Sequence, residues 1–464
     1  MTMIEIGKIE RVYLLGIGGI GMSALARYFH FIGKVVDGYD KTPTSLTLDL
    51  EKEGIAVHYS DDLQQVPGLN EKDSTVVIYT PAVPNDFSEF VYFRENGFAV
   101  YKRSAVLGLL TSGKRCIAIA GTHGKTSVTT MTAHLLKQSH VDCSAFMGGI
   151  SKNYGTNLLL PKNKSQYIVV EADEFDRSFL QLHPELAVIT WMDADHLDIY
   201  GDHENMIKAF AGFISQIQVG GTLLYRKGSA IDRKWNDKIR YFTYSVSEEA
   251  DFQVLQLMII QGAYHFDLKT PFGEIRDLCL TYPGLMNVEN AVAACGMALM
   301  SGVSSEEIRV ALSSYSGVVR RFDVRYSGKK TIYIDDYAHH PRELEATIKS
   351  VRDIYPGKRI TGIFQPHLFS RTKDFASDFA AALDLLDDAL IMEIYPAREL
   401  PVEGVDSGII LNKMKLASRE RCKKEDFPMI LKNFHPDILL TLGAGDIDRL
   451  VEPIIAYLKE NEDA

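Results

Sequence analysis

The sequence predicts an α/β protein of several domains, with parallel sheets in the first and last parts of the chain and a mixed sheet between them. Short apolar runs alternate with helix-like segments over residues 11–100 and again over residues 331–446, and this alternation is typical of the β-α-β units that build parallel sheets. A chain of 464 residues, 46% of them hydrophobic, can bury more than one core. We therefore expect two or three domains.

In the first part of the chain, apolar runs at residues 11–15, 35–40 and 75–80 predict strands, and residues 23–33 predict the helix that follows the first of them. A new unit opens with the apolar run at residues 115–121. It continues with a predicted helix and two predicted strands, at residues 128–138, 167–173 and 186–192.

Residues 220–280 break this alternation. Their apolar runs are separated by turns that contain glycine, which predicts antiparallel strands at residues 220–225, 250–256 and 263–275. Beyond a helix predicted over residues 288–302, strands and helices alternate again, at residues 331–337, 343–355, 359–366, 378–396 and 437–446. Boundaries near residues 106 and 318 divide the chain into expected domains of residues 1–106, 107–318 and 319–464.

Composition and charge exclude several classes of function. The 50 basic and 61 acidic residues give a net charge of -11, which argues against a nucleic-acid or membrane-surface partner and favours a small charged ligand. The five cysteines form no CxxC pair, so we expect buried thiols in a reducing compartment, without a disulfide frame or zinc site. The start, MTMIEIGKIE, has no apolar run of signal-peptide length, and no stretch of about 18 apolar residues occurs anywhere, so we expect a cytoplasmic protein.

A first glycine loop, LLGIGGIGMSALA, places Gly16, Gly18 and Gly21 in a GxGxxG frame between a predicted strand and a predicted helix. Such glycines let the backbone approach a pyrophosphate at the helix start, and Asp40 follows where it could reach a ribose or the loop itself. Taken alone, the frame favours a dinucleotide over simple close packing of the helix. It does not say which nucleotide is bound.

A second loop, AIAGTHGKTSVTT, is more specific. Residues 121–126 read GTHGKT, which supplies backbone N–H groups for phosphate oxygens, a lysine for the β and γ phosphates and a hydroxyl for magnesium. The loop departs from the common GxxxxGK[ST] spacing, because residue 119 is Ile. We expect a nucleoside triphosphate here rather than a plain turn.

Acidic residues follow two predicted strands of the same domain. They are Glu171, Asp173, Glu174 and Asp176 after the first strand, and Asp193, Asp195, His196 and Asp198 after the second. The carboxyl ends of parallel strands are where α/β folds bind ligands, and a magnesium-nucleotide needs such donors. Either group alone would more often be helix caps and solvated loop, but behind a GKT loop the two together favour a metal.

The third domain repeats this arrangement. After predicted strands come Asp335, Asp336, Tyr337, His339 and His340, and then His367 and Arg371, while Arg320 and Arg321 stand at the domain boundary. Zinc is a weaker interpretation of the adjacent histidines, because such neighbours point apart and no third ligand is evident. The arginines fit a carboxylate or a phosphate, and surface ion pairs remain the alternative.

Together these motifs resemble one family, the Mur ligases, over nearly the whole chain. The resemblance rests on GIGGIGMSALA, AGTHGKTS, EADEFDRSFL, DADHLD, PGLMNVENAVAA, GVVRRFD, DDYAHHP, FQPHLFSRT, IYPARE and TLGAGD, which occur in the family's order. It implies an N-terminal Rossmann-like domain for a UDP-sugar, a central P-loop ATPase domain with a mixed sheet, and a C-terminal Rossmann-like domain that helps to hold an amino acid. The first glycine loop would then hold the UDP pyrophosphate, and the dinucleotide hypothesis would fall.

The resemblance also implies the substrates and the site residues. ATP, Mg²⁺, UDP-N-acetylmuramate and L-alanine are expected, with a monomer or weak dimer. The implied catalytic residues are Lys125, Glu171, His196, His339 and Arg371, and the implied metal ligands are Thr126, Glu171 and His196. The implied ATP-binding residues are Gly121, Thr122, His123, Gly124, Lys125, Thr126, Ser127, Asn287, Asn290, Arg321 and Asp336. The implied UDP-sugar residues are Gly16, Gly18, Gly19, Gly21 and Asp40, and the implied amino-acid residues are Tyr337, His367 and Arg371.

The implied activity is attack of the lactyl carboxylate on the γ-phosphate of ATP, followed by attack of the amine on the resulting acyl phosphate. His196, His339 or a substrate oxygen could take the amine proton. Three alternatives stay open: a ligase that attaches a whole tripeptide to the same UDP-sugar, a nucleotide-binding homologue without catalysis, and a nicotinamide oxidoreductase. Four positions depart from the family pattern, namely Phe175, Trp191, Met286 and Leu368, and Leu368 removes a cation from the expected carboxyl region.

Overall fold

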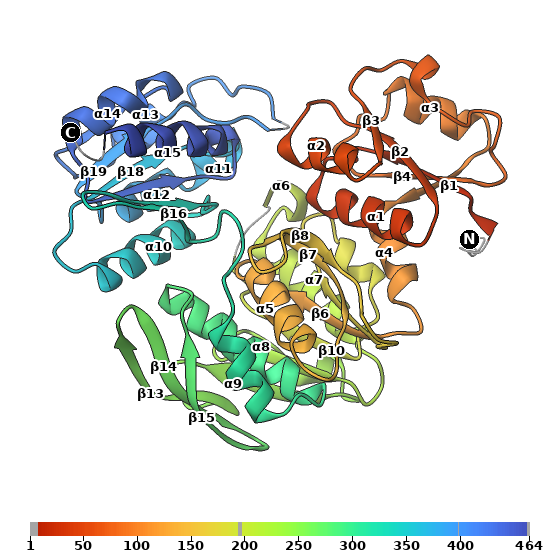
Figure 1. Cartoon of the computed structure of the whole chain (residues 1–464), viewed down its shortest axis with the longest axis horizontal. Helices are drawn as coiled ribbons and strands as arrows, with labels where there is room; N and C mark the ends of the chain where they lie inside the picture. Colours follow the sequence, from red (N-terminus) through yellow and green to blue (C-terminus); the bar gives the residue numbers. More distant parts are fainter. Residues whose placement is uncertain (1–7, 194–196, 398, 462–464) are drawn as a thin grey trace. The chain divides into compact units, whose positions relative to one another are not determined.

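The computed structural model describes residues 8–193, 197–397 and 399–461, and the strands of these residues form three sheets (Figure 1). The chain divides into two compact units. The first unit holds the first sheet and most of the second, and the second unit holds the third sheet with residues 257–265 and 279–289. The predicted α/β class, with a mixed sheet in the middle of the chain, is confirmed. The domain boundaries proposed near residues 106 and 318 stay predictions.

The first sheet has five parallel strands in the order β3-β2-β1-β4-β5. Its strands are β1 (Arg11–Leu15), β2 (Val35–Tyr39), β3 (Ala56–His58), β4 (Thr75–Tyr79) and β5 (Ala99–Lys102). The helices of this region are α1 (Ile20–Phe31), α2 (Ser45–Lys52), α3 (Ser88–Glu95) and α4 (Arg103–Thr111). The predicted strands and the predicted helix at residues 23–33 are confirmed, to within a few residues at their ends.

The second sheet has ten strands in the order β15-β14-β13-β12-β11-β10-β6-β9-β7-β8. They are β6 (Arg115–Ala120), β7 (Ser144–Ser151), β8 (Thr156–Leu159), β9 (Tyr167–Glu171), β10 (Leu186–Ile189), β11 (Thr222–Arg226), β12 (Arg240–Ser245), β13 (Phe252–Ile260), β14 (Ala263–Thr270) and β15 (Gly273–Leu280). Strand β6 lies between β9 and β10 and runs parallel to both, so the carboxyl ends of these three strands meet at one edge.

The antiparallel prediction for residues 220–225 is wrong. Strand β11 pairs in parallel with β10 and with β12, a strand that the sequence pattern did not reveal. The physical reason is that helix α7 (His203–Ser215) provides the crossover that a parallel pair requires. The prediction for residues 250–256 is wrong on one side as well, because β13 pairs in parallel with β12. Strands β13, β14 and β15 lie side by side at the far end of the sheet and are joined by two-residue turns, as antiparallel hairpins are (Figure 1).

The other helices of this region are α5 (Lys125–Lys137), α6 (Leu197–Tyr200), α8 (Leu285–Met300) and α9 (Ser305–Ser313). Helix α5 follows β6 directly, and buried apolar side chains of the first and second sheets pack into one continuous cluster. All five cysteines carry free thiols, and four of them are buried, in line with the expectation of buried thiols.

The third sheet has six strands in the order β16-β17-β21-β18-β19-β20, and all its neighbours are parallel except β16 and β17. Its strands are β16 (Asp323–Ser327), β17 (Ile332–Asp336), β18 (Ile360–Phe364), β19 (Asp388–Ile391), β20 (Arg419–Arg421) and β21 (Ile438–Leu442). Its helices are α10 (Pro341–Ile354), α11 (Phe369–Asp374), α12 (Ala376–Leu383), α13 (Gly408–Leu411), α14 (Phe427–Phe434) and α15 (Val451–Glu460). No helix among the described residues is both long and apolar enough to span a membrane.

Candidate active site

The GTHGKT loop turns from the end of β6 into the start of α5. Gly121 and Gly124 have φ angles of +133° and +80°, in the region that favours glycine, and Gly124 caps the helix whose first residue is Lys125. A Cβ atom on Gly124 would lie 2.7 Å from Oδ1 of Asn290, so the α8 side chain of Asn290 packs directly against the loop. The tight turn brings the Lys125 side chain back over the loop.

Lys125 is held by two acceptors. Its Nζ donates hydrogen bonds to the Gly121 carbonyl at 2.7 Å and to Oε1 of Glu174 at 2.8 Å. Burial lowers the pKa of Lys125, but the carboxylates of Glu174, Asp173 and Glu171 outweigh it and hold the pKa above its ordinary value. The ammonium therefore stays charged, as a group that neutralises phosphate must.

Glu174 is fully buried beneath this lysine. Burial raises the pKa of Glu174 to about 7, against the lowering effect of the Lys125 ammonium. The Glu174 carbonyl accepts hydrogen bonds from the Tyr200 hydroxyl at 2.6 Å and the Arg177 amide at 2.9 Å, which fixes its backbone. The sequence pattern showed Glu174 only as one of several carboxylates after β9. It did not indicate the pairing with Lys125.

Thr126 and Glu171 form the second part of the site. The Thr126 hydroxyl donates a hydrogen bond to Oε1 of Glu171 at 3.2 Å, and the Gly148 amide of β7 donates to Oε2 at 3.2 Å. A hydroxyl and a carboxylate are hard oxygen donors of the kind Mg²⁺ prefers. Within residues 8–193, 197–397 and 399–461, no group of three or more His, Cys, Asp or Glu side chains is arranged to hold a metal. His196, the third predicted ligand, lies outside the described residues.

The remaining loop residues contact the strand next to β6. The Thr122 amide donates to the Trp191 carbonyl at 2.9 Å, and the Asp193 amide donates to the Thr122 hydroxyl at 3.1 Å. Nε2 of His123 lies 3.5 Å from Oδ2 of Asp193. Ser127, in the first turn of α5, is buried. These contacts tie the loop to the end of β10.

The glycine loop of the first sheet is organised by Asp40. The Gly18 amide donates to Oδ2 of Asp40 at 2.8 Å, and the Gly16 amide donates to the Tyr39 carbonyl at 2.8 Å. Gly19 caps α1, and a Cβ atom on Gly21 would lie 2.9 Å from Nη1 of Arg103. Asp40 thus bonds to the loop, one of the two roles expected for it.

A cavity of about 230 Å³ lies between this glycine loop and the end of β9. The loop and helix α1 line one side, and Gly148, Glu171 and Asp173 line the other. Arg103, at the start of α4, also lines it. Glu171 therefore lines the cavity beside the first glycine loop and also accepts a hydrogen bond from Thr126, which follows the second glycine loop, a relationship that no sequence motif indicated.

In the second unit, Asn287 and Asp336 are both buried. The Asn287 side-chain amide donates to the Pro283 carbonyl. The two carboxylate oxygens of Asp336 accept hydrogen bonds at 2.7 Å from the amides of Phe322 and Ala338, and burial raises the pKa of Asp336 to about 6. Asp336 thus shapes the loop that carries Tyr337.

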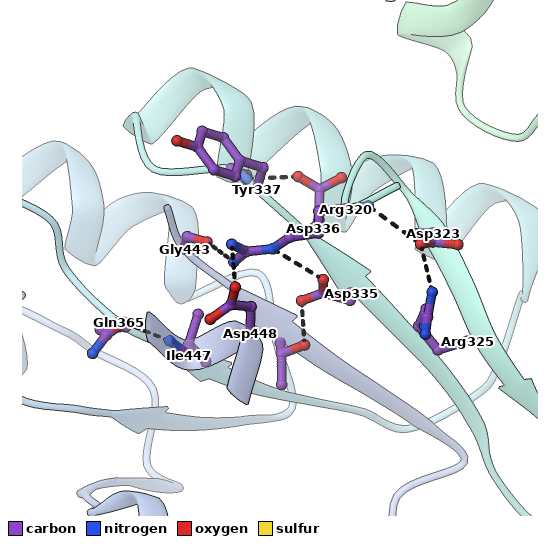
Figure 2. A network of polar contacts seen from close by, with 12 residues as sticks. Arg320, Asp323, Arg325, Asp335, Asp336, Tyr337, Gln365, Gly443, Ile447 and Asp448 are labelled. Carbon is purple, nitrogen blue, oxygen red and sulfur yellow. Dashed lines mark hydrogen bonds and ion pairs between the residues drawn. The ribbon is translucent and has the colours of Figure 1, made fainter. Parts of the chain in front are cut away.

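Two guanidinium groups contact the ring of Tyr337. Those of Arg320 and Arg321 lie 5.2 and 4.7 Å from its ring centre, and the Tyr337 amide donates to the Arg320 carbonyl at 2.7 Å. Figure 2 shows the Arg320 guanidinium directed toward Asp335 and Asp448. It also donates to the Gly443 carbonyl at 2.7 Å. Arg320 therefore stabilises the fold by linking the end of β17 to the loop after β21.

The adjacent histidines His339 and His340 make different contacts. His340 caps α10, while the His339 ring lies 5.9 Å from the His367 ring, and His367 stacks on Tyr395 at 5.8 Å. Nδ1 of His339 lies 3.2 Å from a carboxylate oxygen of Glu343. Neither Tyr395 nor Glu343 was singled out by the sequence, although Tyr395 falls in the IYPARE motif.

Two of the unusual residues have clear structural surroundings. Leu368 is buried, with a φ angle of +69°, immediately before α11, which carries the buried Arg371. The Arg226 guanidinium lies 3.5 Å from the centre of the Trp191 ring. Leu368 thus contributes to the core instead of supplying the missing cation, and Trp191 forms a cation–π contact at the edge of the GTHGKT loop.

Family models match successive parts of the chain. The model described as the Mur ligase family, catalytic domain, matches residues 11–115, the Mur ligase middle domain matches residues 119–298, and the Mur ligase, glutamate ligase domain, matches residues 320–445.

Several relatives match this chain almost end to end. The UDP-N-acetylmuramate–L-alanine ligase of Phocaeicola vulgatus is 48% identical over 458 residues, covering 98% of this chain and 100% of the relative. The enzyme of the same name from Porphyromonas gingivalis strain W83 is 51% identical, covering 97% and 99% of the two chains. The crystal structure of UDP-N-acetylmuramate-alanine ligase from Thermotoga maritima superposes with a TM-score of 0.81 at 25% identity, covering 97% and 99% of the two chains.

Proposed function

This chain belongs to the Mur ligase family, and from that premise we propose that it is an ATP-dependent ligase joining L-alanine to the lactyl carboxylate of UDP-N-acetylmuramate. The reaction releases ADP and phosphate and serves peptidoglycan precursor synthesis in the cytoplasm. The observation that carries the proposal is the convergence of Lys125, Thr126 and Glu171 at the carboxyl ends of adjacent parallel strands.

The chemistry requires an activated carboxylate, because a carboxylate is a poor electrophile. Transfer of the γ-phosphate of ATP to the lactyl carboxylate makes an acyl phosphate, which the neutral amine of L-alanine then attacks with loss of phosphate. The first step brings two anions together. Lys125, which is charged and anchored to Gly121 and Glu174, is placed to reduce their repulsion and to hold the phosphates in line.

Thr126 and Glu171 would hold Mg²⁺, since the hydroxyl and a carboxylate oxygen already lie 3.2 Å apart. Magnesium bound to phosphates usually keeps one or two protein ligands and several waters, which fits this donor pair. The ion supplies neutralisation of the negative charge on the transferring phosphoryl group. The role of Gly148 is to keep Glu171 in place through its amide.

The other roles follow the family pattern. We assign the adenine side to Asn287 and Asn290, further nucleotide contacts to Arg321 and Asp336, and the amino-acid side to Tyr337, His367 and Arg371. His339 is a candidate acceptor of the amine proton, because its ring lies beside His367 and Glu343. His196 is the other candidate.

One assay tests the proposal. Purified protein is incubated with Mg-ATP, UDP-N-acetylmuramate and, in separate reactions, L-alanine, glycine, L-serine or the tripeptide, and phosphate release is measured. We expect the highest kcat/KM with L-alanine. Preference for the tripeptide would identify a recycling ligase instead, and absence of phosphate release dependent on any amine would refute ligase activity.

A further inference from the structure

The cavity between the first glycine loop and the end of β9 has an uneven charge. Glu171 and Asp173 contribute two carboxylates to its lining. Among the described residues that line it, Arg103 is the only base. The other lining side chains are apolar or uncharged. The carboxylates of Glu171 and Asp173 repel an anion that enters this cavity. Arg103 is the cation in the lining that attracts it.

Arg103 lies near residues on both sides of the cavity, Gly21 on one side and Asp173 on the other. It is the first residue of α4, directly after β5, and its guanidinium lies beside Gly21 at the start of α1. Nη2 of Arg103 lies 3.8 Å from Oδ2 of Asp173, beyond hydrogen-bond distance. The same three residues Arg103, Glu171 and Asp173 also line a smaller neighbouring cavity. The guanidinium is thus placed beside the carboxylates without a tight bidentate bond to Asp173.

We propose that Arg103 binds the reacting carboxylate of the sugar substrate and holds it beside Glu171 for phosphoryl transfer. This inference rests on the proposed function. A planar guanidinium binds a carboxylate through two parallel hydrogen bonds, which fixes its orientation as well as its position. The pyrophosphate of the same substrate has another partner in the proposed site, the backbone at the start of α1. The carboxylate must lie nearer to Glu171, where Arg103 is the protein cation of the cavity lining.

The test compares two nucleotide sugars. UDP-N-acetylmuramate carries the lactyl carboxylate, and UDP-N-acetylglucosamine is the same nucleotide sugar without the lactyl group. Dissociation constants are measured by calorimetry for the wild type, Arg103→Gln and Arg103→Lys. We expect Arg103→Gln to weaken binding of UDP-N-acetylmuramate at least tenfold and binding of UDP-N-acetylglucosamine less than twofold. For UDP-N-acetylmuramate, the dissociation constant of Arg103→Lys should lie between those of the wild type and Arg103→Gln, because lysine keeps the positive charge but lacks the planar guanidinium.

Lys102→Gln is the matched control. Lys102 precedes Arg103, pairs with Asp176 at 2.7 Å and does not line the cavity, so its loss removes one cation from the same segment. We expect both dissociation constants to stay within twofold of the wild type.

Other outcomes overturn the proposal. Equal weakening for the two sugars would assign Arg103 to the pyrophosphate or to folding, and unchanged binding of UDP-N-acetylmuramate would remove it from the site. If Arg103→Gln unfolds below the assay temperature, the dissociation constants of Arg103→Lys for the two sugars are compared with those of the wild type instead. Binding is scored without turnover, so the two failures are distinguishable: a wild type that forms no product refutes the proposed function, and with it the reaction at this carboxylate, while the binding comparison alone decides whether Arg103 binds the lactyl carboxylate.

Discussion

Both carboxylate oxygens of Glu174 lie 2.8 Å from Nζ of Lys125, and the Glu174 side chain is fully buried in the loop that follows β9. The lysine of the GTHGKT loop therefore has a buried counter-charge within the protein itself. A buried ion pair contributes little net stability when intact, but removing one partner strands the other charge. Glu174 is thus a structural constraint on Lys125, and the pair makes the role of Lys125 separable from its effect on folding.

Replacing Lys125 by methionine should abolish turnover and also destabilise the protein. The loss of turnover follows from the missing phosphate cation, and a stability loss of about 3 kcal/mol follows from burying Glu174 without its partner. Phosphate release and chemical denaturation measure the two effects. A near-normal rate would show that the loop is misassigned.

The double variant Lys125→Met/Glu174→Gln is the control for this experiment. Removing the stranded charge should restore most of the stability, while turnover stays absent. Recovery of turnover together with stability would mean that Lys125 acts only through the fold.

Replacing Glu171 by glutamine should raise the Mg²⁺ concentration needed for half-maximal activity at least tenfold, because a neutral amide is a weaker ligand for a hard cation than a carboxylate. A magnesium titration at saturating ATP measures this. Glu185→Gln is the matched control, since Glu185 pairs with Arg115 at the opposite end of the central strands. An unchanged magnesium requirement in Glu171→Gln would exclude Glu171 as a metal ligand.

Gly148→Ala should lower activity by displacing the carboxylate of Glu171. A Cβ atom on Gly148 would lie 2.2 Å from Oε2 of Glu171, too close for any contact, so the carboxylate must move. We expect activity to fall at least tenfold with little change in melting temperature. Gly212→Ala, on helix α7, is the control: its nearest neighbour, a methyl of Leu180, would lie at 3.4 Å. If both alanine variants retain full activity, Gly148 does not hold Glu171 in its working position.

Glu89 should make stability depend on pH. Its side chain is fully buried, accepts a hydrogen bond from the Tyr13 hydroxyl at 2.6 Å, and its pKa is raised by burial to about 7. Between the ordinary value of 4.5 and about 7, the unfolded chain loses this proton while the folded chain keeps it. Stability is therefore retained below pH 4.5 and falls as the pH rises through that window, by roughly 3 kcal/mol at most.

Comparing wild type with Glu89→Gln isolates this contribution. The two melting temperatures should be similar at pH 5, and the variant should melt several degrees higher at pH 8. His58, whose pKa is lowered by burial, lies 3.5 Å from Glu89 and is present in both proteins. Glu95→Gln, an exposed position on the same helix, should show no such change with pH. If the melting temperatures of the wild type and Glu89→Gln change with pH by the same amount, the prediction is contradicted.

Much of the fold could be predicted because its signals are local. The run at residues 11–15 and the glycines after it predict a strand, a turn and a helix without reference to the rest of the chain. Strand β11 shows where this fails: its apolar run fits either pairing direction, and the crossover through α7 decides the matter. Strand β7 was missed because Gly148 and Gly149 interrupt its apolar pattern, and β8 was missed because it is only four residues long.

The sequence by itself determined which chemistry this protein carries: the order of its motifs indicates the family, and the GTHGKT loop indicates a phosphate site. Only the tertiary structure decided which of the many carboxylates does what. Glu174 lies beneath Lys125, Glu171 contacts Thr126, and Asp336 organises its own loop. The reason is that these roles depend on distances of a few ångströms between strands far apart in the chain, and sheet order, not sequence spacing, determines those distances.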